Sequence, residues 1–162
     1  MENHINIAIA KQLPSVSDTC DVATSLAGVL KLGDLLLFTG EIGSGKTTFI
    51  QALAKGLDIK ENVTSPTFVL HALYDSGRIP LSHVDLYRLN SDAEVESIGF
   101  DEYLDSSVTA VEWADRYTRF QAANLTLDFA YGAAENERTL TMRMNGGDWV
   151  DRLAGIFAEV KP

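Results

Sequence analysis

The chain has 162 residues, 46% of them hydrophobic and 22% charged, a globular composition that predicts one domain over residues 1–162 and excludes a largely disordered chain. The net charge of −10 disfavours independent binding to DNA or RNA, whose phosphates attract basic surfaces, and favours a protein partner with a basic face. A single cysteine, the lack of an apolar run of roughly 20 residues and an N-terminus unlike a signal peptide predict a cytoplasmic protein that does not enter a membrane.

The N-terminal part of the chain shows a strand pattern followed by a helix pattern. Residues 5–9 alternate between apolar and other side chains, as a half-buried strand does. Residues 15–33 place apolar side chains on one helical face. We expect Ser17 or Asp18 to cap this helix and Gly33 to end it.

A continuous apolar run at residues 35–39 predicts a strand that is buried on both faces of a parallel sheet. A glycine-rich turn follows this run, and residues 46–57 then read as a helix with Gly56 at its end. The turn is therefore expected to join a buried strand to a helix.

The middle of the chain predicts two strands and a short helix. Residues 67–74 and 79–89 have strand-like composition and are separated by a turn. The sequence "SDAE" at residues 91–94 fits a capping box. In such a box the Ser91 hydroxyl caps the helix, and the Glu94 side chain reaches back to the amide of Ser91.

The C-terminal part predicts three strands and a helix. Residues 107–113 form another short apolar strand, and residues 124–131 and 138–145 alternate on either side of a polar loop, as an antiparallel hairpin does. Residues 148–160 read as an amphipathic helix. Helices between buried strands, followed by a hairpin, predict an α/β fold with a mixed parallel and antiparallel sheet flanked by helices.

The turn "GEIGSGKTTF" at residues 40–49 matches the pattern G-x-x-x-x-G-K-[ST] through Gly40, Gly45, Lys46 and Thr47. Glycines let backbone amides approach a polyphosphate closely, and the helix that follows presents its N-terminal amides to the same oxygens. The Lys46 ammonium can reach the β- and γ-phosphates, and the Thr47 hydroxyl can bind Mg²⁺. The turn therefore predicts a P-loop NTPase fold that binds a nucleoside triphosphate.

Most of the expected nucleotide contacts come from consecutive residues of this loop: Glu41, Ile42, Gly43, Ser44, Gly45, Lys46, Thr47 and Thr48. We count Lys46 among the catalytic groups as well, because its charge is directed at the transferred phosphoryl group. We also expect Lys46 to be exposed in the loop, so that its removal leaves the fold intact.

Two acids end predicted strands and are candidates for the remaining chemistry. Asp85 lies near the end of one strand and Glu112 ends another, and ligands of such sheets bind beside the carboxyl ends of the strands. We assign Asp85 mainly to the Mg²⁺ shell and Glu112 to the junction between the metal and the attacking water. Trp113 reads equally as a core residue or as a nucleotide contact. His71 and His83 lack metal-ligand spacing and are expected to be partly buried strand residues.

Several further segments occur together with the phosphate loop, in one order and at characteristic spacing: "VTSPTFVL" at 63–70, "HVDLYRL" at 83–89, "IGFDEYL" at 98–104 and "VEW" at 111–113. With them the chain resembles the TsaE (YjeE) ATPases of bacterial tRNA threonylcarbamoyladenosine biosynthesis, over residues of about 15 to 147. The phosphate loop alone is generic, whereas the combination of the other segments is specific to this family.

The resemblance implies a small P-loop protein that hydrolyses ATP with Mg²⁺, slowly without its partners. It implies two partner proteins, of the TsaB and TsaD type, that assemble the modified adenosine at position 37 of certain tRNAs. The family's metal and catalytic positions fall on Thr47, Asp85 and Glu112, and its nucleotide-proximal tryptophan falls on Trp113. The segment "SPTF" corresponds to a switch-like loop near the γ-phosphate, which here carries Thr67 among the nucleotide contacts.

The segment "EWADR" departs from the family pattern, in which a proline and a second glutamate commonly follow "EW". This departure leaves Asp115 without an expected role.

Two other functions fit a phosphate loop with strand-end acids. A small-molecule P-loop kinase usually carries an arginine-bearing lid, whereas the arginines here are scattered singly. The second alternative is a nucleotide-gated protein-binding module with little turnover of its own. This interpretation overlaps with that of an ATPase. A GTPase is disfavoured because no N-K-x-D sequence occurs.

Overall fold

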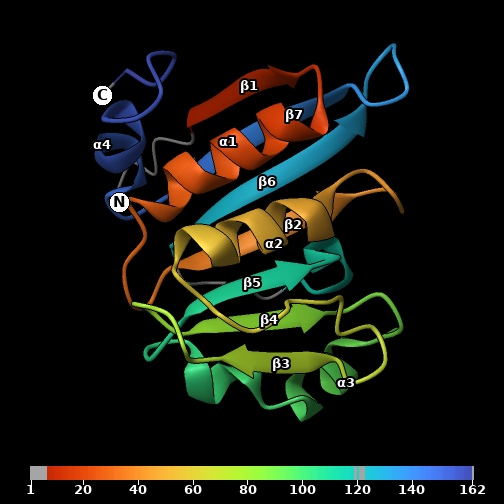
Figure 1. Ribbon diagram of the computed structural model, residues 1–162. Coiled ribbons are helices and arrows are strands. Elements are labelled where there is room, and N and C mark those ends of the chain that lie inside the picture. The colour runs from red at the N-terminus through yellow and green to blue at the C-terminus, as the bar shows by residue number, and fades with distance from the viewer. Residues whose placement is uncertain (1–6, 119, 121–122, 162) are drawn as a thin grey trace, which may run out of the picture.

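A mixed sheet forms the centre of the computed structural model, which describes residues 7–118, 120 and 123–161 (Figure 1). Within these residues the sheet has seven strands in the order β1-β7-β6-β2-β5-β4-β3. The strands are β1 (Ile7–Leu13), β2 (Leu35–Gly40), β3 (His71–Tyr74), β4 (Leu81–Asp85), β5 (Val108–Glu112), β6 (Asn124–Tyr131) and β7 (Arg138–Asn145). The helices are α1 (Val16–Ala27), α2 (Lys46–Gly56), α3 (Asp92–Ser97) and α4 (Trp149–Ala154), with the 3₁₀ helices η1 (Phe100–Tyr103) and η2 (Ala114–Arg116).

The four central strands of the sheet run parallel to one another. Strand β2 pairs in parallel with β6 on one side and with β5 on the other, and β5 pairs in parallel with β4. The outer strands are antiparallel, since β7 pairs with β6 and β1, and β3 pairs with β4. The predicted mixed α/β sheet is confirmed, and so are both strands of the predicted hairpin.

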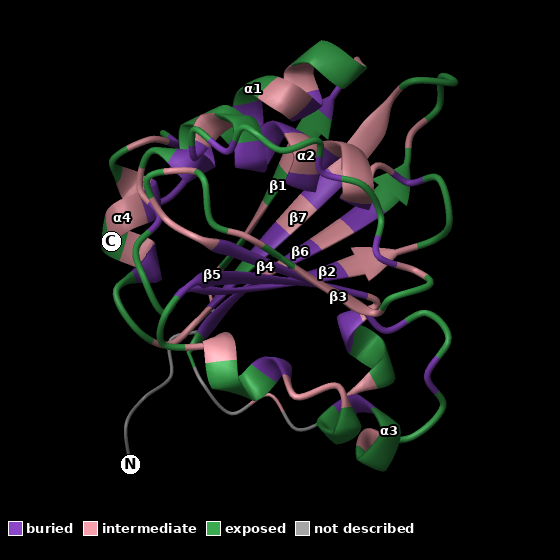
Figure 2. Cartoon of the chain, turned by 60° about the horizontal axis from the view of Figure 1, so that its bottom comes forward, coloured by how far each residue is buried: buried purple, intermediate pink, exposed green. Residues whose placement is uncertain are grey.

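Helices cover both faces of the sheet (Figure 2). Helices α1 and α2 lie over one face, and α3 lies over the other. A hydrophobic core lies on each face of the sheet. Along β2, Leu36 and Phe38 pack in the core beneath α1 and α2, whereas Leu35 and Leu37 pack in the core on the other face. Successive residues of β2 thus face the two cores in turn, which is why its sequence is continuously apolar.

Helix α1 differs from the prediction at both ends. Its cap is Ser15, whose hydroxyl accepts a hydrogen bond from the amide of Asp18, so the expected caps at Ser17 and Asp18 are wrong by two or three residues. The helix stops at Gly28 and not at Gly33, because the chain turns there towards β2. Strand β1 covers most of the expected first strand and continues to Leu13, while residues 5 and 6 lie outside the described part of the chain.

The strand predicted at residues 67–74 is half as long as expected. Strand β3 begins only at His71, because Leu70 adopts a left-handed conformation with φ 68° and its amide bonds to the carbonyl of Pro66. Phe68 and Val69 are 83% and 69% exposed, so their strand-like composition does not reflect burial. The strand expected at residues 79–89 is also shorter, and forms β4.

Two predictions about helices α3 and α4 need correction. Ser91 caps α3 as predicted, but the Glu94 carboxylate accepts its hydrogen bond from the amide of Asn90 at 2.6 Å and not from that of Ser91. Helix α4 ends at Ala154, before Gly155, so the helix predicted to reach residue 160 is shorter. None of the helices in the described ranges is long and apolar enough to cross a membrane.

Candidate functional site

The glycine-rich loop lies at the centre of the sheet edge where the parallel strands end. It follows β2, the middle strand, and leads directly into α2 (Figure 1). Strand β5 ends beside it with Glu112, and β4 ends next to β5 with Asp85. Parallel pairing therefore brings three chain segments that are distant in sequence to one edge.

Gly40 begins the loop in a conformation and a space that only glycine fits. Its φ is +128°, and a Cβ atom at this position would lie 2.5 Å from the carbonyl oxygen of Phe129 on β6. Any side chain there would be strained and would push β6 away from β2. The first glycine of the motif thus allows the loop to turn against the sheet.

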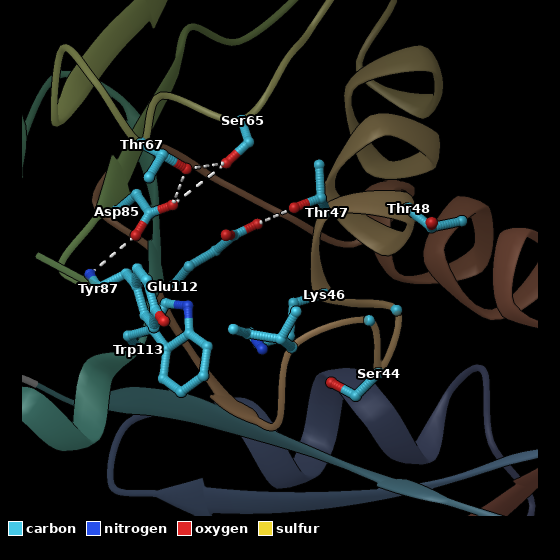
Figure 3. A pocket seen from close by; sticks show the side chains of 13 residues that line it. Ser44, Lys46, Thr47, Thr48, Ser65, Thr67, Asp85, Tyr87, Glu112 and Trp113 are labelled. Carbon is cyan, nitrogen blue, oxygen red and sulfur yellow. Dashed lines mark hydrogen bonds between the residues drawn. The ribbon is translucent and has the colours of Figure 1, made fainter.

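A cavity of about 330 Å³ lies between the loop and the ends of β4 and β5 (Figure 3). Its wall contains nearly all of the residues expected at the site and two others, Ser65 and Tyr87: Ile42, Gly43, Ser44, Gly45, Lys46, Thr47, Thr48, Ser65, Thr67, Asp85, Tyr87, Glu112 and Trp113. Glu41 is the exception, since it lines a neighbouring cavity with Asp115 and Asp128. The nucleotide contact expected of Glu41 therefore stays a prediction.

Lys46 is folded into the loop, so the expectation that it is exposed is wrong. It is 5% exposed, and its ammonium donates to the carbonyl oxygens of Gly40 at 2.6 Å and Glu41 at 2.9 Å. The same ammonium lies 4.2 Å from the centre of the Trp113 ring, at cation–π distance. Burial lowers the pKa of Lys46 below its usual value, although Glu112, Asp85 and Asp115 act in the opposite direction.

Glu112 joins β5 to the start of α2. It is 3% exposed, and its Oε1 accepts a hydrogen bond of 2.7 Å from the Thr47 hydroxyl. The Nε2 atom of the fully buried His83 lies 3.4 Å from the same oxygen. Burial acts to raise the pKa of Glu112, but His83, Thr47 and the charge of Lys46 outweigh it and hold that pKa below its usual value. Glu112 is therefore ionised at neutral pH.

Asp85 connects β4 to the loop that precedes β3. Its Oδ2 accepts hydrogen bonds from the hydroxyls of Ser65 at 3.1 Å and Thr67 at 2.9 Å, and its Oδ1 accepts one from the amide of Tyr87 at 2.8 Å. With 2% exposure, the carboxylate needs these donors to be stable in the protein interior. Asp85 thus connects the end of β4 to the loop that carries Thr67.

Trp113 lines the cavity and also packs against the core, so its contact with the nucleotide stays a prediction. It adopts the left-handed conformation with φ 59°, which a tryptophan rarely occupies, and its ring centre is 4.9 Å from that of Tyr87. The half-buried indole lies between the two cavities and contacts Lys46. The strained backbone turns the ring towards the phosphate loop (Figure 3).

Sequence reasoning missed several of the residues that complete the site. His83 was expected to be partly buried, but it is fully buried against Glu112. Ser65 and Tyr87 line the cavity, although neither was assigned a role. Alternation along β4 could have placed His83 and Asp85 on one face, because they are two residues apart in a strand.

The oxygen atoms around Thr47 suit a hard divalent cation. The Thr47 hydroxyl and the carboxylates of Glu112 and Asp85 converge on the cavity (Figure 3). Mg²⁺ prefers such oxygen ligands, and commonly takes only a few from the protein and the rest from phosphates and water. The described residues contain no group of three or more His, Cys, Asp or Glu side chains that could hold a metal ion.

Comparison with known proteins identifies relatives of the whole fold. The family model of the threonylcarbamoyl adenosine biosynthesis protein TsaE matches residues 13–140. A tRNA threonylcarbamoyladenosine biosynthesis protein TsaE of Streptomyces coelicolor is 35% identical over 145 residues, which are 85% of this chain and 98% of the relative. The protein of the same name from Nostoc sp. is 37% identical over 74% of this chain and 76% of its own. The crystal structure of Bacillus subtilis YdiB superposes with a TM-score of 0.77 at 28% identity, over 94% of this chain and 96% of the other.

Proposed function

The chain belongs to the TsaE family, and we propose that it is a Mg²⁺-dependent ATP hydrolase of the machinery that makes N6-threonylcarbamoyladenosine at position 37 of tRNA. The curated relatives are named as tRNA threonylcarbamoyladenosine biosynthesis proteins. The same family assignment supports a TsaB-type and a TsaD-type protein as partners, a cytoplasmic location and a single ATPase domain over residues 1–162.

One contact supports hydrolysis more than any other, the 2.7 Å hydrogen bond between Thr47 and Glu112. It joins the metal-binding hydroxyl of the phosphate loop to a buried, ionised carboxylate at the end of the neighbouring strand. Phosphoryl transfer to water requires a positioned metal and an aligned water, and these two groups stand where both would be held.

Each side chain of the site then has a role that follows from its position. Lys46 would leave the carbonyls of Gly40 and Glu41 for the β- and γ-phosphates, which offer it full negative charge. Mg²⁺, when bound, would supply positive charge that offsets the negative charge developing on the phosphoryl group. Thr47 and Asp85 would hold this ion, and Glu112 would both contact it and accept a proton from the attacking water. Thr67, on the loop tied to Asp85, would approach the γ-phosphate.

A nucleotide-gated binding module is the second candidate function, and one observation favours it. The loop whose Ser65 and Thr67 hydroxyls bond to Asp85 also exposes the neighbouring Phe68 and Val69 to solvent. A change at Asp85 would therefore move an exposed apolar surface, as a gated module needs.

Phosphate release from Mg²⁺-ATP, measured with the protein alone and then with its TsaB- and TsaD-type partners, separates the two candidates. The ATPase predicts release that depends on Mg²⁺ and increases with the partners. Tight ATP binding without release in either condition would favour the binding module. If this protein bound no ATP, both candidate functions would be wrong.

A further inference from the structure

Two side chains outside the phosphate-binding motif hold the backbone of the phosphate loop. Tyr131, at the end of β6, and Arg138, at the start of β7, are direct partners across the hairpin. The Tyr131 hydroxyl donates to the carbonyl of Ile42. The Arg138 guanidinium donates to the carbonyl of Gly43 from Nη2 and to that of Ser44 from Nε, each at 3.2 Å. One cross-strand pair thus binds three consecutive carbonyls of the loop.

The position of these carbonyls determines the direction of the amides that follow them. In a trans peptide the C=O of one residue and the N–H of the next point in opposite directions. Carbonyls of Ile42, Gly43 and Ser44 that face the hairpin therefore turn the amides of Gly43, Ser44 and Gly45 away from it. The Ser44 amide donates to the carbonyl of Glu41 at 3.1 Å, so the amides of Gly43 and Gly45 are the ones that we expect to face a phosphate. Gly43, Ser44 and Gly45 line the cavity beside Lys46 and Thr47. Inward amides of this kind make up an anion-binding nest.

We propose that Tyr131 and Arg138 are positioning residues that orient the amides of the phosphate loop towards the nucleotide phosphates. This inference rests on the proposed function, because it assumes that the cavity binds a nucleotide. Lys46 holds the two preceding carbonyls, those of Gly40 and Glu41, from the opposite side. Hydrogen bonds therefore hold the loop at two places. Lys46 binds its first carbonyls, and Tyr131 and Arg138 bind those in its middle.

The pair fits this role because its two side chains have further contacts in the hairpin and lie outside the core. The Arg138 guanidinium lies 4.5 Å over the Tyr131 ring, and its Nη1 also bonds to the carbonyls of Glu135 and Glu137 in the hairpin. A Cβ atom on Gly43 would lie 2.9 Å from the Tyr131 hydroxyl, so the tyrosine reaches the loop only because that residue is glycine. Tyr131 is nevertheless 50% exposed, so loss of its hydroxyl removes little buried contact.

The test measures ADP affinity by calorimetry in the absence of divalent cations, for wild type, Tyr131→Phe and Arg138→Met. The first variant loses one hydrogen bond to the loop and the second loses two, so the expected losses in ADP affinity are about threefold and about tenfold. The KM for ATP should rise by similar factors, and the temperature of unfolding should stay near that of the wild type. Tyr131→Phe keeps the ring, so it remains informative if Arg138→Met folds poorly.

Arg143→Met is the matched control, because Arg143 lies on the same strand and is exposed. It should bind ADP as the wild type does. Wild-type ADP affinity in both hairpin variants would overturn the inference. An equal loss of ADP affinity in Arg143→Met would also overturn it, because the effect would then come from the loss of a positive charge at any position. Failure of the wild type itself to bind ADP would overturn the proposed function as well.

Discussion

Asp85 and Glu112 are paired residues at the carboxyl ends of the adjacent parallel strands β4 and β5. Although they are neighbours, they contact different parts of the molecule. Glu112 bonds to Thr47 at the start of α2, whereas Asp85 bonds to Ser65 and Thr67 in the loop before β3. The two carboxylates thus link the site to two separate segments, and their removal should produce different defects.

Asp85→Asn should raise the Mg²⁺ concentration that half-maximal ATP turnover requires, by roughly tenfold or more. The amide keeps the shape of the side chain but removes the charge that attracts the ion, and it also gives up acceptor capacity towards Ser65 and Thr67. Titration of turnover with Mg²⁺ measures the effect. Asp105→Asn, at an exposed acid, should leave the Mg²⁺ requirement unchanged. An unaltered requirement in Asp85→Asn would remove this residue from the metal site.

Thr47→Ala should lose Mg²⁺-dependent turnover much more than it loses affinity for ADP in the absence of metal. The substitution deletes a proposed metal ligand and the hydrogen bond to Glu112, but it leaves the backbone amide of the residue in place. Calorimetry with ADP and a phosphate-release assay measure the two quantities separately. Thr24→Ala, on the exposed face of α1, is the control. Equal losses in both quantities would contradict the assignment.

Lys46→Ala should weaken ATP binding by about tenfold or more, because hydrogen bonds from a charged donor to the phosphates are lost. The variant should stay close to the wild type in its free energy of unfolding, because two opposing effects are removed together. Burial lowers the pKa of Lys46, so the folded protein disfavours this charge relative to the unfolded chain, but the ammonium also donates to the carbonyls of Gly40 and Glu41. Calorimetry and thermal unfolding, with the exposed Lys55→Ala on the same helix as control, measure both effects. A clear loss of stability in Lys46→Ala would contradict the stability argument.

Arg152→Met should lower the free energy of unfolding by about 2–4 kcal/mol. Arg152 makes two hydrogen bonds, of 2.6 and 2.8 Å, to Asp34, which is 8% exposed and would be left buried without its partner. Urea denaturation measures the loss, and Arg143→Met should stay close to the wild type. Asp34 directly precedes β2, at the opposite end from the phosphate loop, so ATP affinity of the folded variant should not change.

The parts of the site that the sequence predicted are those specified by local patterns. The phosphate loop is contiguous, and strand ends can be recognised from apolar runs, so Thr47, Asp85 and Glu112 could be placed at one edge before the structure was known. The burial of Lys46 could not be predicted, because it involves contact with Trp113, which follows β5 far along the chain and adopts a rare backbone conformation.

The parts that could not be predicted depend on contacts between segments far apart in the chain. The contact of Arg138 with the loop joins residues separated by 94 positions, and no local pattern marks it. Residues 67–70 have the composition of a strand, but Leu70 turns the chain and leaves Phe68 exposed. Strand propensity indicates which side chains fit a half-buried sheet. It does not determine whether the strand extends to a given residue.

The most direct test of the central claim is the rate of phosphate release from bound Mg²⁺-ATP in Glu112→Gln. The substitution removes the proton acceptor and the negative charge while keeping the size of the side chain and a possible contact with Thr47. We predict that release falls by about 10²-fold or more, that ATP still binds, and that Glu102→Gln, at an exposed acid, hydrolyses ATP as the wild type does. Release at the wild-type rate from Glu112→Gln would contradict the account, because the buried carboxylate beside Thr47 would then have no part in hydrolysis.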